Sequence, residues 1–124
     1  MTRLLQIITA LPALLFLIIG LRWLFDPAGV APEFGLTLDS GLGLSSQIGD
    51  MSGYFLTLAA CIFTGLISKQ KIWFYPAMML LSATAAGRLL AFFVHDAALA
   101  SAILVEVVVT SILFAASKKL DANS

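Results

Sequence analysis

The chain has 124 residues, of which 60% are hydrophobic and only 11% are charged. A soluble domain is about 45–50% apolar and about 25% charged, so this composition excludes a disordered chain, a nucleic-acid-binding protein and an ordinary cytosolic enzyme. Seven basic and seven acidic side chains sum to a formal net charge of zero, which gives no indication of a charged partner. The composition therefore indicates a small integral membrane protein.

Four apolar segments are long enough to cross a bilayer, which takes about 20 helical residues. They are Leu4–Phe25, Gly49–Ile67, Ile72–Phe93 and Ala97–Ala116. The first is longer than the 7–15-residue core typical of a cleavable signal and no Ala-x-Ala site follows it, so we expect it to be retained. The expected fold is an all-α, four-helix membrane bundle that forms a single transmembrane domain over residues 1–124.

The basic residues predict how the helices are oriented. Those outside the apolar segments lie at the N-terminus, in the second connection and at the C-terminus: Arg3, Lys69, Lys71, Lys118 and Lys119. With four spans these three places share one side, which the positive-inside rule makes cytoplasmic. On the opposite side, all of the Asp, Glu, Lys and Arg residues in the loops are acidic: Asp26, Glu33, Asp39 and Asp96. We expect a multi-pass protein of a bacterial inner membrane, with both termini inside.

The long outer loop, about residues 26–48, carries its own structural signals. Asp26-Pro27 is typical of a helix N-cap followed by proline at the first helical position. We therefore expect a short interfacial helix near Pro27–Phe34 that stops around Gly35. A loop of this length is often a functional lid, and an inert cover for the bundle is an equally good interpretation.

Four charged residues fall within or next to the apolar segments, one on each: Arg22, Asp50, Arg88 and Glu106. An unpaired charge in mid-membrane costs roughly 2.5–3.5 kcal/mol on insertion scales, so we expect the four to face each other or water. Tyr54 follows Asp50 at helical spacing on the same face. We predict ligand-binding roles for these five residues, with the arginines contacting the ligand and the carboxylates orienting them.

Small residues at four-residue spacing suggest where helix backbones approach each other. Gly49 and Gly53 are spaced in this way in the second segment, as are Ala83 and Gly87 in the third. Such pairs are common at contacts between membrane helices. We expect them to mark close helix packing.

Other kinds of site find little support in the sequence. A single histidine and no paired Cys or His spacing argue against a zinc or haem site. The serines Ser45, Ser46 and Ser52 have no histidine nearby in the sequence to act as a base. We assign no catalytic or metal-ligating residue, name no cofactor and do not expect an enzyme.

Several short motifs in a fixed order resemble those of a known family. They are Gly20-Leu21-Arg22-Trp23-Leu24-Phe25-Asp26-Pro27, Phe34-Gly35-Leu36, Asp50-Met51-Ser52-Gly53-Tyr54-Phe55-Leu56, Gly87-Arg88 and Glu106. Together they resemble domain-of-unknown-function family 4345, a group of small, DoxX-like bacterial membrane proteins with four helices. The resemblance implies a four-helix inner-membrane protein and names no substrate.

Three functional hypotheses follow from these features. The first is a membrane protein that binds a lipid-like or quinone-like molecule or serves as an accessory subunit of a membrane complex. The second is a proton-coupled small-molecule transporter, and the third is a purely structural ion-pair network. Membrane lipids are the expected surroundings, a homo-oligomer or larger membrane complex is compatible with so small a bundle, and no nucleic acid is expected.

Overall fold

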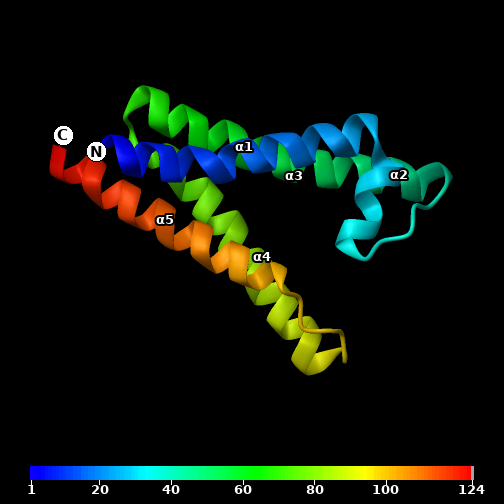
Figure 1. The fold of residues 1–124 in the computed structure, drawn as a ribbon. Coiled ribbons are helices and arrows are strands. Elements are labelled where there is room, and N and C mark those ends of the chain that lie inside the picture. The colour runs from blue at the N-terminus through cyan, green and yellow to red at the C-terminus, as the bar shows by residue number, and fades with distance from the viewer. Residues whose placement is uncertain (124) are drawn as a thin grey trace. The chain divides into compact units, whose positions relative to one another are not determined.

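The computed structural model describes residues 1–123 as a succession of helices without a β-strand (Figure 1). Its elements are α1 (Arg3–Phe25), α2 (Pro27–Val30), the 3-10 turn η1 (Ala31–Phe34), α3 (Gly41–Ser68), a second 3-10 turn η2 (Lys71–Trp73), α4 (Phe74–Val94) and α5 (Ala102–Asn123). The expected all-α class is confirmed.

The chain divides into two compact units. The first, called the α4–α5 unit, comprises Met1–Ala10 and Cys61–Ser124. The second, called the aromatic unit, comprises Leu11–Ala60. The long helices α1 and α3 each contribute one part to both units.

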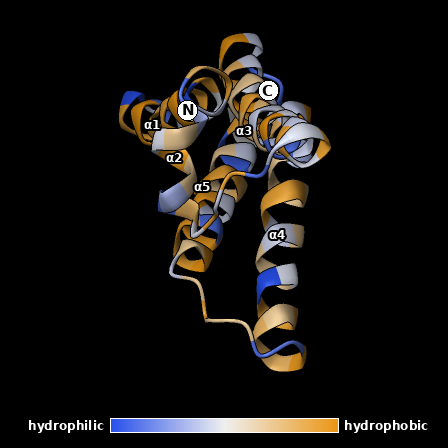
Figure 2. Ribbon diagram, turned by 90° about the vertical axis from the view of Figure 1, so that its right-hand side faces the viewer, coloured by the Kyte–Doolittle hydropathy of each residue, from blue (hydrophilic) through white to orange (hydrophobic). Residues whose placement is uncertain are grey.

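Within residues 1–123, three helical segments are long and apolar enough to cross a membrane: Arg3–Phe25, Gly41–Ser68 and Lys71–Val94. Most of each segment faces outward, and large apolar side chains such as Met79 and Phe93 are 70% and 76% exposed. Figure 2 shows hydrophobic residues along most of the helical ribbon. A soluble protein rarely exposes apolar surface this extensively, so these outward faces are suited to lipid.

The fourth expected span differs from the structure at its start. We predicted a helix from Ala97, whereas α5 begins at Ala102. From there to Ala116 a helix rises only about 22 Å, against roughly 30 Å of hydrocarbon. Glu106 lies inside this apolar stretch, and Lys118 and Lys119 follow it. Periodicity could not reveal the later start, because residues 97–101 are as apolar as the helix that follows them.

The second helix also begins earlier than predicted, at Gly41 rather than Gly49. Two hydrogen bonds of the Gln47 side chain to residues before the helix accompany this earlier start. The Asp39 backbone N–H donates to Gln47 Oε1 at 2.8 Å, and Gln47 Nε2 donates to the Thr37 carbonyl at 3.1 Å. These two bonds satisfy one backbone donor and one backbone acceptor of the segment before the helix and hold that segment beside the first turns of α3.

The short helix expected near Pro27–Phe34 is confirmed as α2 followed by η1. Asp26 caps it, since its Oδ1 accepts a hydrogen bond from the Gly29 backbone N–H at 3.2 Å. The α2 turn continues into η1, which ends where Gly35 adopts the left-handed conformation with φ 70°. Glycine accepts this conformation without steric cost, so it is a natural helix stop.

Aromatic rings form the core of the aromatic unit. Trp23 near the end of α1 is fully buried, and its ring centroid lies 5.9 Å from that of Phe34 in η1. Phe34 in turn lies 5.4 Å from Phe55 on α3, and Phe55 lies 5.8 Å from Phe16 on α1. The edge-on contacts fasten the loop turn between the two helices.

The α4–α5 unit is built on the contact between its two long antiparallel helices, which run side by side in Figure 1. Phe74 and Leu81 on α4 and Leu113 on α5 are almost completely buried. A Cβ added at Gly65, near the end of α3, would lie 2.6 Å from the Phe74 ring, so that ring packs directly on the α3 backbone. The turn η2 contacts both α4 and α5.

In the aromatic unit, α1 and α3 approach each other closely at Gly20, not at the predicted Gly49 and Gly53. A Cβ at Gly20 would lie 2.7 Å from Leu56 Cγ and 3.2 Å from the Leu56 backbone nitrogen. A Cβ at Gly49 or Gly53 would meet no atom of the unit within 4 Å. The prediction from small-residue spacing was therefore wrong for this pair.

Gly20→Val should destabilise the protein through overpacking against Leu56, whereas Gly53→Val has open space for the same side chain. We expect the free energy of unfolding of Gly20→Val to be lower than that of Gly53→Val by about 1–3 kcal/mol. Equilibrium unfolding in detergent micelles measures the difference. Equal stabilities of the two variants would contradict the close approach at Gly20.

Candidate functional site

Two of the predicted charged residues meet in the α4–α5 unit. Arg88 Nε on α4 donates to Glu106 Oε2 on α5 at 3.1 Å. The Glu106 side chain is only 8% exposed, whereas that of Arg88 is 35% exposed. A buried carboxylate is thus joined to an arginine that reaches toward the edge of the helix pair.

The other two predicted charges lie in the aromatic unit and do not pair with each other. Arg22 forms an ion pair with Glu33 of η1 instead, at 2.5 Å between Nη2 and Oε2. Asp50 is exposed on α3, and no ion pair joins it to another residue of that unit. Sequence reasoning had placed Glu33 among the loop charges, because nothing in the spacing reveals that α2 and η1 fold back toward the end of α1.

Tyr54, the fifth predicted residue, also lies in the aromatic unit. It is half-buried on α3, and its ring stands edge-on to Phe55 with centroids 5.0 Å apart. Tyr54 therefore extends the aromatic core described above. The α4–α5 unit supplies Arg88 and Glu106 without it.

Beside the Arg88–Glu106 pair, a partly open hollow of about 130 Å³ lies between α4 and α5. Its apolar lining consists of Leu81, Ala85 and Val107, and its polar lining consists of Ser82, Glu106, Thr110 and Ser111. We call it the α4–α5 hollow. Glu106 thus lines the hollow, whereas Arg88, which donates to the Glu106 carboxylate, is not part of the lining.

One oxygen of Glu106 has no hydrogen-bond donor. Oε2 accepts from Arg88, but Oε1 is buried and no donor in the described part of the chain reaches it. Buried polar atoms in proteins are nearly always hydrogen-bonded, so such an atom marks either a bound partner or a functional demand. Here the atom belongs to a residue that lines a hollow.

A second depression of about 470 Å³ lies on the loop of the aromatic unit. It is more open than the α4–α5 hollow, and Thr37 supplies the polar side chain in a lining that is otherwise apolar: Ala28, Ala31, Pro32, Leu36 and Leu38. No charged side chain lines it. The combination of charge, burial and an unpartnered acceptor is therefore a property of the α4–α5 hollow.

Among residues 1–123, no three His, Cys, Asp or Glu side chains are grouped so that they could hold a metal ion. The carboxylate of Glu106 is engaged by arginine rather than by another acid. The chemistry available in the α4–α5 hollow is hydrogen bonding and apolar contact.

Neither a protein-family model nor a curated protein nor a solved structure matches the chain. The resemblance to the DoxX-like family stays a prediction that rests on the motifs quoted above.

Acidification should weaken the attachment of η1 to α1. The hydrogen bond from Arg22 holds the pKa of Glu33 below its ordinary value of 4.5. Because this pKa is depressed in the folded protein, the ion pair stabilises the fold above pH 4.5 and its contribution is lost as the pH falls through the folded-state value. Amide protection factors of residues 26–36, from hydrogen exchange, should decline over that range.

Glu33→Gln should remove most of this pH dependence, and Asp39→Asn, which changes another exposed acid of the loop, should preserve it. The same decline in all three proteins would show that Glu33 is not the titrating group.

Replacing one residue of the Arg88–Glu106 pair should lower the free energy of unfolding far more than replacing both residues with apolar ones. Removal of one partner from a buried pair costs about 3–5 kcal/mol, whereas an apolar replacement of both is close to neutral. Because Arg88 is one-third exposed, we expect Arg88→Met to cost about 3 kcal/mol. Arg88→Met/Glu106→Leu should regain most of that stability, and the charge-swapped pair should regain part.

Arg22→Met is the matched control, since it breaks a pair whose carboxylate is exposed and should cost much less stability than Arg88→Met. Unfolding in micelles gives all four values. A double variant no more stable than Arg88→Met would refute the energetic coupling between the two residues.

Proposed function

We propose that this chain is a multi-pass protein of a bacterial inner membrane that binds a lipid-like or quinone-like molecule in the α4–α5 hollow. It acts alone, as a homo-oligomer or as an accessory subunit of a membrane complex. The observation that carries the proposal is the buried, unpartnered Oε1 of Glu106 beside a hollow that opens between two apolar helices.

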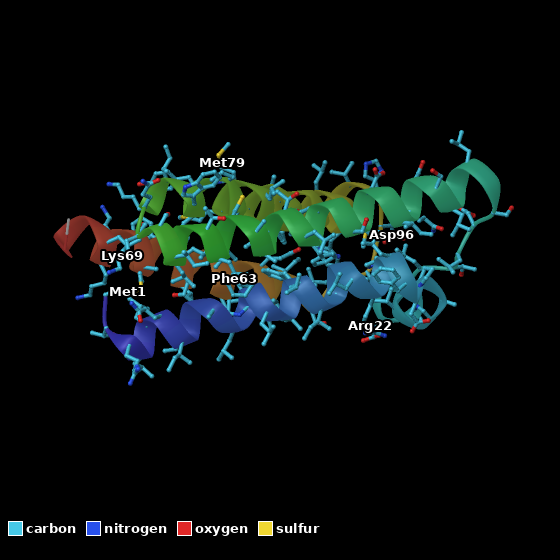
Figure 3. All side chains as sticks on the ribbon, turned by 90° about the horizontal axis from the view of Figure 1, so that it is seen from above. Met1, Arg22, Phe63, Lys69, Met79 and Asp96 are labelled. Atoms are coloured by element: carbon cyan, nitrogen blue, oxygen red, sulfur yellow. The ribbon has the colours of Figure 1, made fainter. Side chains whose placement is uncertain are left out.

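Membrane residence is supported by three helical segments long and apolar enough to span a bilayer. For the fourth span and the orientation with both termini inside, support comes from the basic residues. Arg3, Lys69, Lys71, Lys118 and Lys119 all belong to the α4–α5 unit. Figure 3 shows Met1 and Lys69 at the same end of that unit. Such clustering of basic residues is typical of the cytoplasmic face.

A purely structural ion pair is the main competing explanation, and the geometry favours binding over it. Arginine can hold a carboxylate through two parallel hydrogen bonds, which satisfies both oxygens. Here Arg88 donates through Nε to Oε2, and Oε1 is left for another donor. A network whose sole task is to fix helix register gains nothing from an acceptor that remains buried and unsatisfied.

The size and position of the hollow suit a membrane ligand. At about 130 Å³ it is close to the ~150 Å³ of a cavity that admits benzene. Because the hollow is partly open, a ring or headgroup can enter while an apolar tail remains along the helix pair. Leu81, Ala85 and Val107 provide apolar contact for the ring.

Purification from membranes should yield the protein with a small molecule bound, seen as a discrete added mass in native mass spectrometry. Ala85→Leu fills part of the hollow and should lower occupancy at least about tenfold, because overpacking a ligand's space costs more than 1.4 kcal/mol.

Ala86→Leu is the matched control, because Ala86 is exposed and is not part of the lining. It should retain the added mass. Either the absence of a bound molecule from the unmodified protein or equal loss in both variants would contradict binding in the hollow.

A further inference from the structure

The polar side chains that line the α4–α5 hollow have mostly acceptor atoms left for a further hydrogen bond. Glu106 Oε1 is a carboxylate oxygen without a donor. The Thr110 hydroxyl donates its proton to the Glu106 carbonyl at 2.7 Å, and the Ser111 hydroxyl donates its proton to the Val107 carbonyl at 2.9 Å. Each of these hydroxyl oxygens can then only accept a further bond. A ligand must therefore supply donors.

The hydroxyl of Ser82 completes the polar lining and can either donate or accept. It does not supply the donor that Glu106 lacks, since no donor in the described part of the α4–α5 unit reaches Oε1. The Glu106 side chain is more than nine-tenths buried, so bulk water does not readily satisfy that oxygen. The strongest acceptor in the hollow is also the one in greatest need of a donor.

The charge of the site selects the kind of donor. Arg88 and Glu106 form a pair with no net charge. A neutral hydroxyl donates to Oε1 and leaves the site neutral, whereas an ammonium group adds an uncompensated positive charge in an apolar region, which is costly. A carbonyl or ether oxygen brings no donor and faces the carboxylate oxygen unfavourably.

We propose that the α4–α5 hollow selects a neutral hydroxyl carried on an apolar body, with Glu106 Oε1 as the acceptor. This inference rests on the proposed function and narrows it. A quinone-like ligand would bind in its hydroxylated, reduced form rather than its carbonyl form, and a lipid would bind through a free hydroxyl. Glu106 is the contact residue and Arg88 its positioning residue.

Four probes that share an apolar character test the donor requirement: 4-pentylphenol, its methyl ether 4-pentylanisole, 1-octanol and 4-pentylbenzylamine. The full-length protein in micelles is titrated with each, and backbone amide NMR signals of residues 81–111 report binding at the hollow. We expect the dissociation constant of the phenol to be at least about tenfold lower than that of the anisole, since a hydrogen bond to a buried charged acceptor is worth about that much.

The alcohol distinguishes the two sources of a hydroxyl. Tighter binding of the phenol than of octanol assigns an aromatic, quinol-like ligand, and the reverse assigns a lipid hydroxyl; both support the inference. An anisole that binds as tightly as the phenol overturns it, and so does an amine that binds more tightly than both hydroxyl probes. Binding of none of the probes overturns the proposed function itself.

A variant pair then locates the acceptor. Glu106→Gln replaces the charged acceptor with a neutral amide and should reduce the preference for phenol over anisole at least about threefold, because charge-assisted hydrogen bonds are about twice as strong as neutral ones. Asp96→Asn, which removes an exposed carboxylate of the same unit, should leave the preference unchanged. An unchanged preference in Glu106→Gln overturns the role of Glu106. The probe series needs no variant, so it decides the donor requirement even if Glu106→Gln does not fold.

Discussion

The α4–α5 unit depends on one ion pair set into an otherwise apolar contact between two helices. Arg88 and Glu106 each interrupt a helix that carries mostly apolar side chains, and neither is tolerable alone in such surroundings. Their meeting fixes which residues of α4 face α5, because a slip along either helix would separate the charges. The position of the hollow follows from that register, since Ala85 and Leu81 lie on α4 one and two turns before Arg88, on the side that faces Glu106.

The aromatic unit uses a different kind of contact for a similar purpose. The Arg22–Glu33 pair is exposed, and such pairs contribute little to stability on their own. The buried ring of Trp23 and its edge-on contact with Phe34 contribute more, since aromatic contacts add to the burial of apolar area. Aromatic packing therefore fastens the loop turn to α1 more than the ion pair does.

How much the sequence could predict depended on whether a signal was local. Asp26-Pro27 and Gly35 bound the short loop helix through their own backbone chemistry, so its prediction was confirmed. Gln47 holds residues 37 and 39 through side-chain bonds across a turn, which periodicity does not encode, and the start of α3 was missed. Likewise, the energetic cost of burying an unpaired charge predicted that the four charged residues would need partners. It could not predict that Arg22 pairs with Glu33, because that contact depends on where η1 folds. Spacing identifies the face on which a residue lies, and only packing identifies what that face meets.

The same distinction explains why the ligand hypothesis came to rest on Glu106 rather than on an arginine. From the sequence, arginines are the natural contacts for a ligand, because they carry several donors and carboxylates carry none. In the structure Arg88 donates its Nε hydrogen to Glu106 Oε2 and is not part of the lining of the hollow. The neighbouring hydroxyls of Thr110 and Ser111 donate their hydrogens to backbone carbonyls. The hollow is left rich in acceptors and poor in donors. If the hollow binds a ligand as we propose, that ligand has to bring the proton, so our proposal of a ligand class rests on the hydrogen-bond inventory more than on the shape of the hollow.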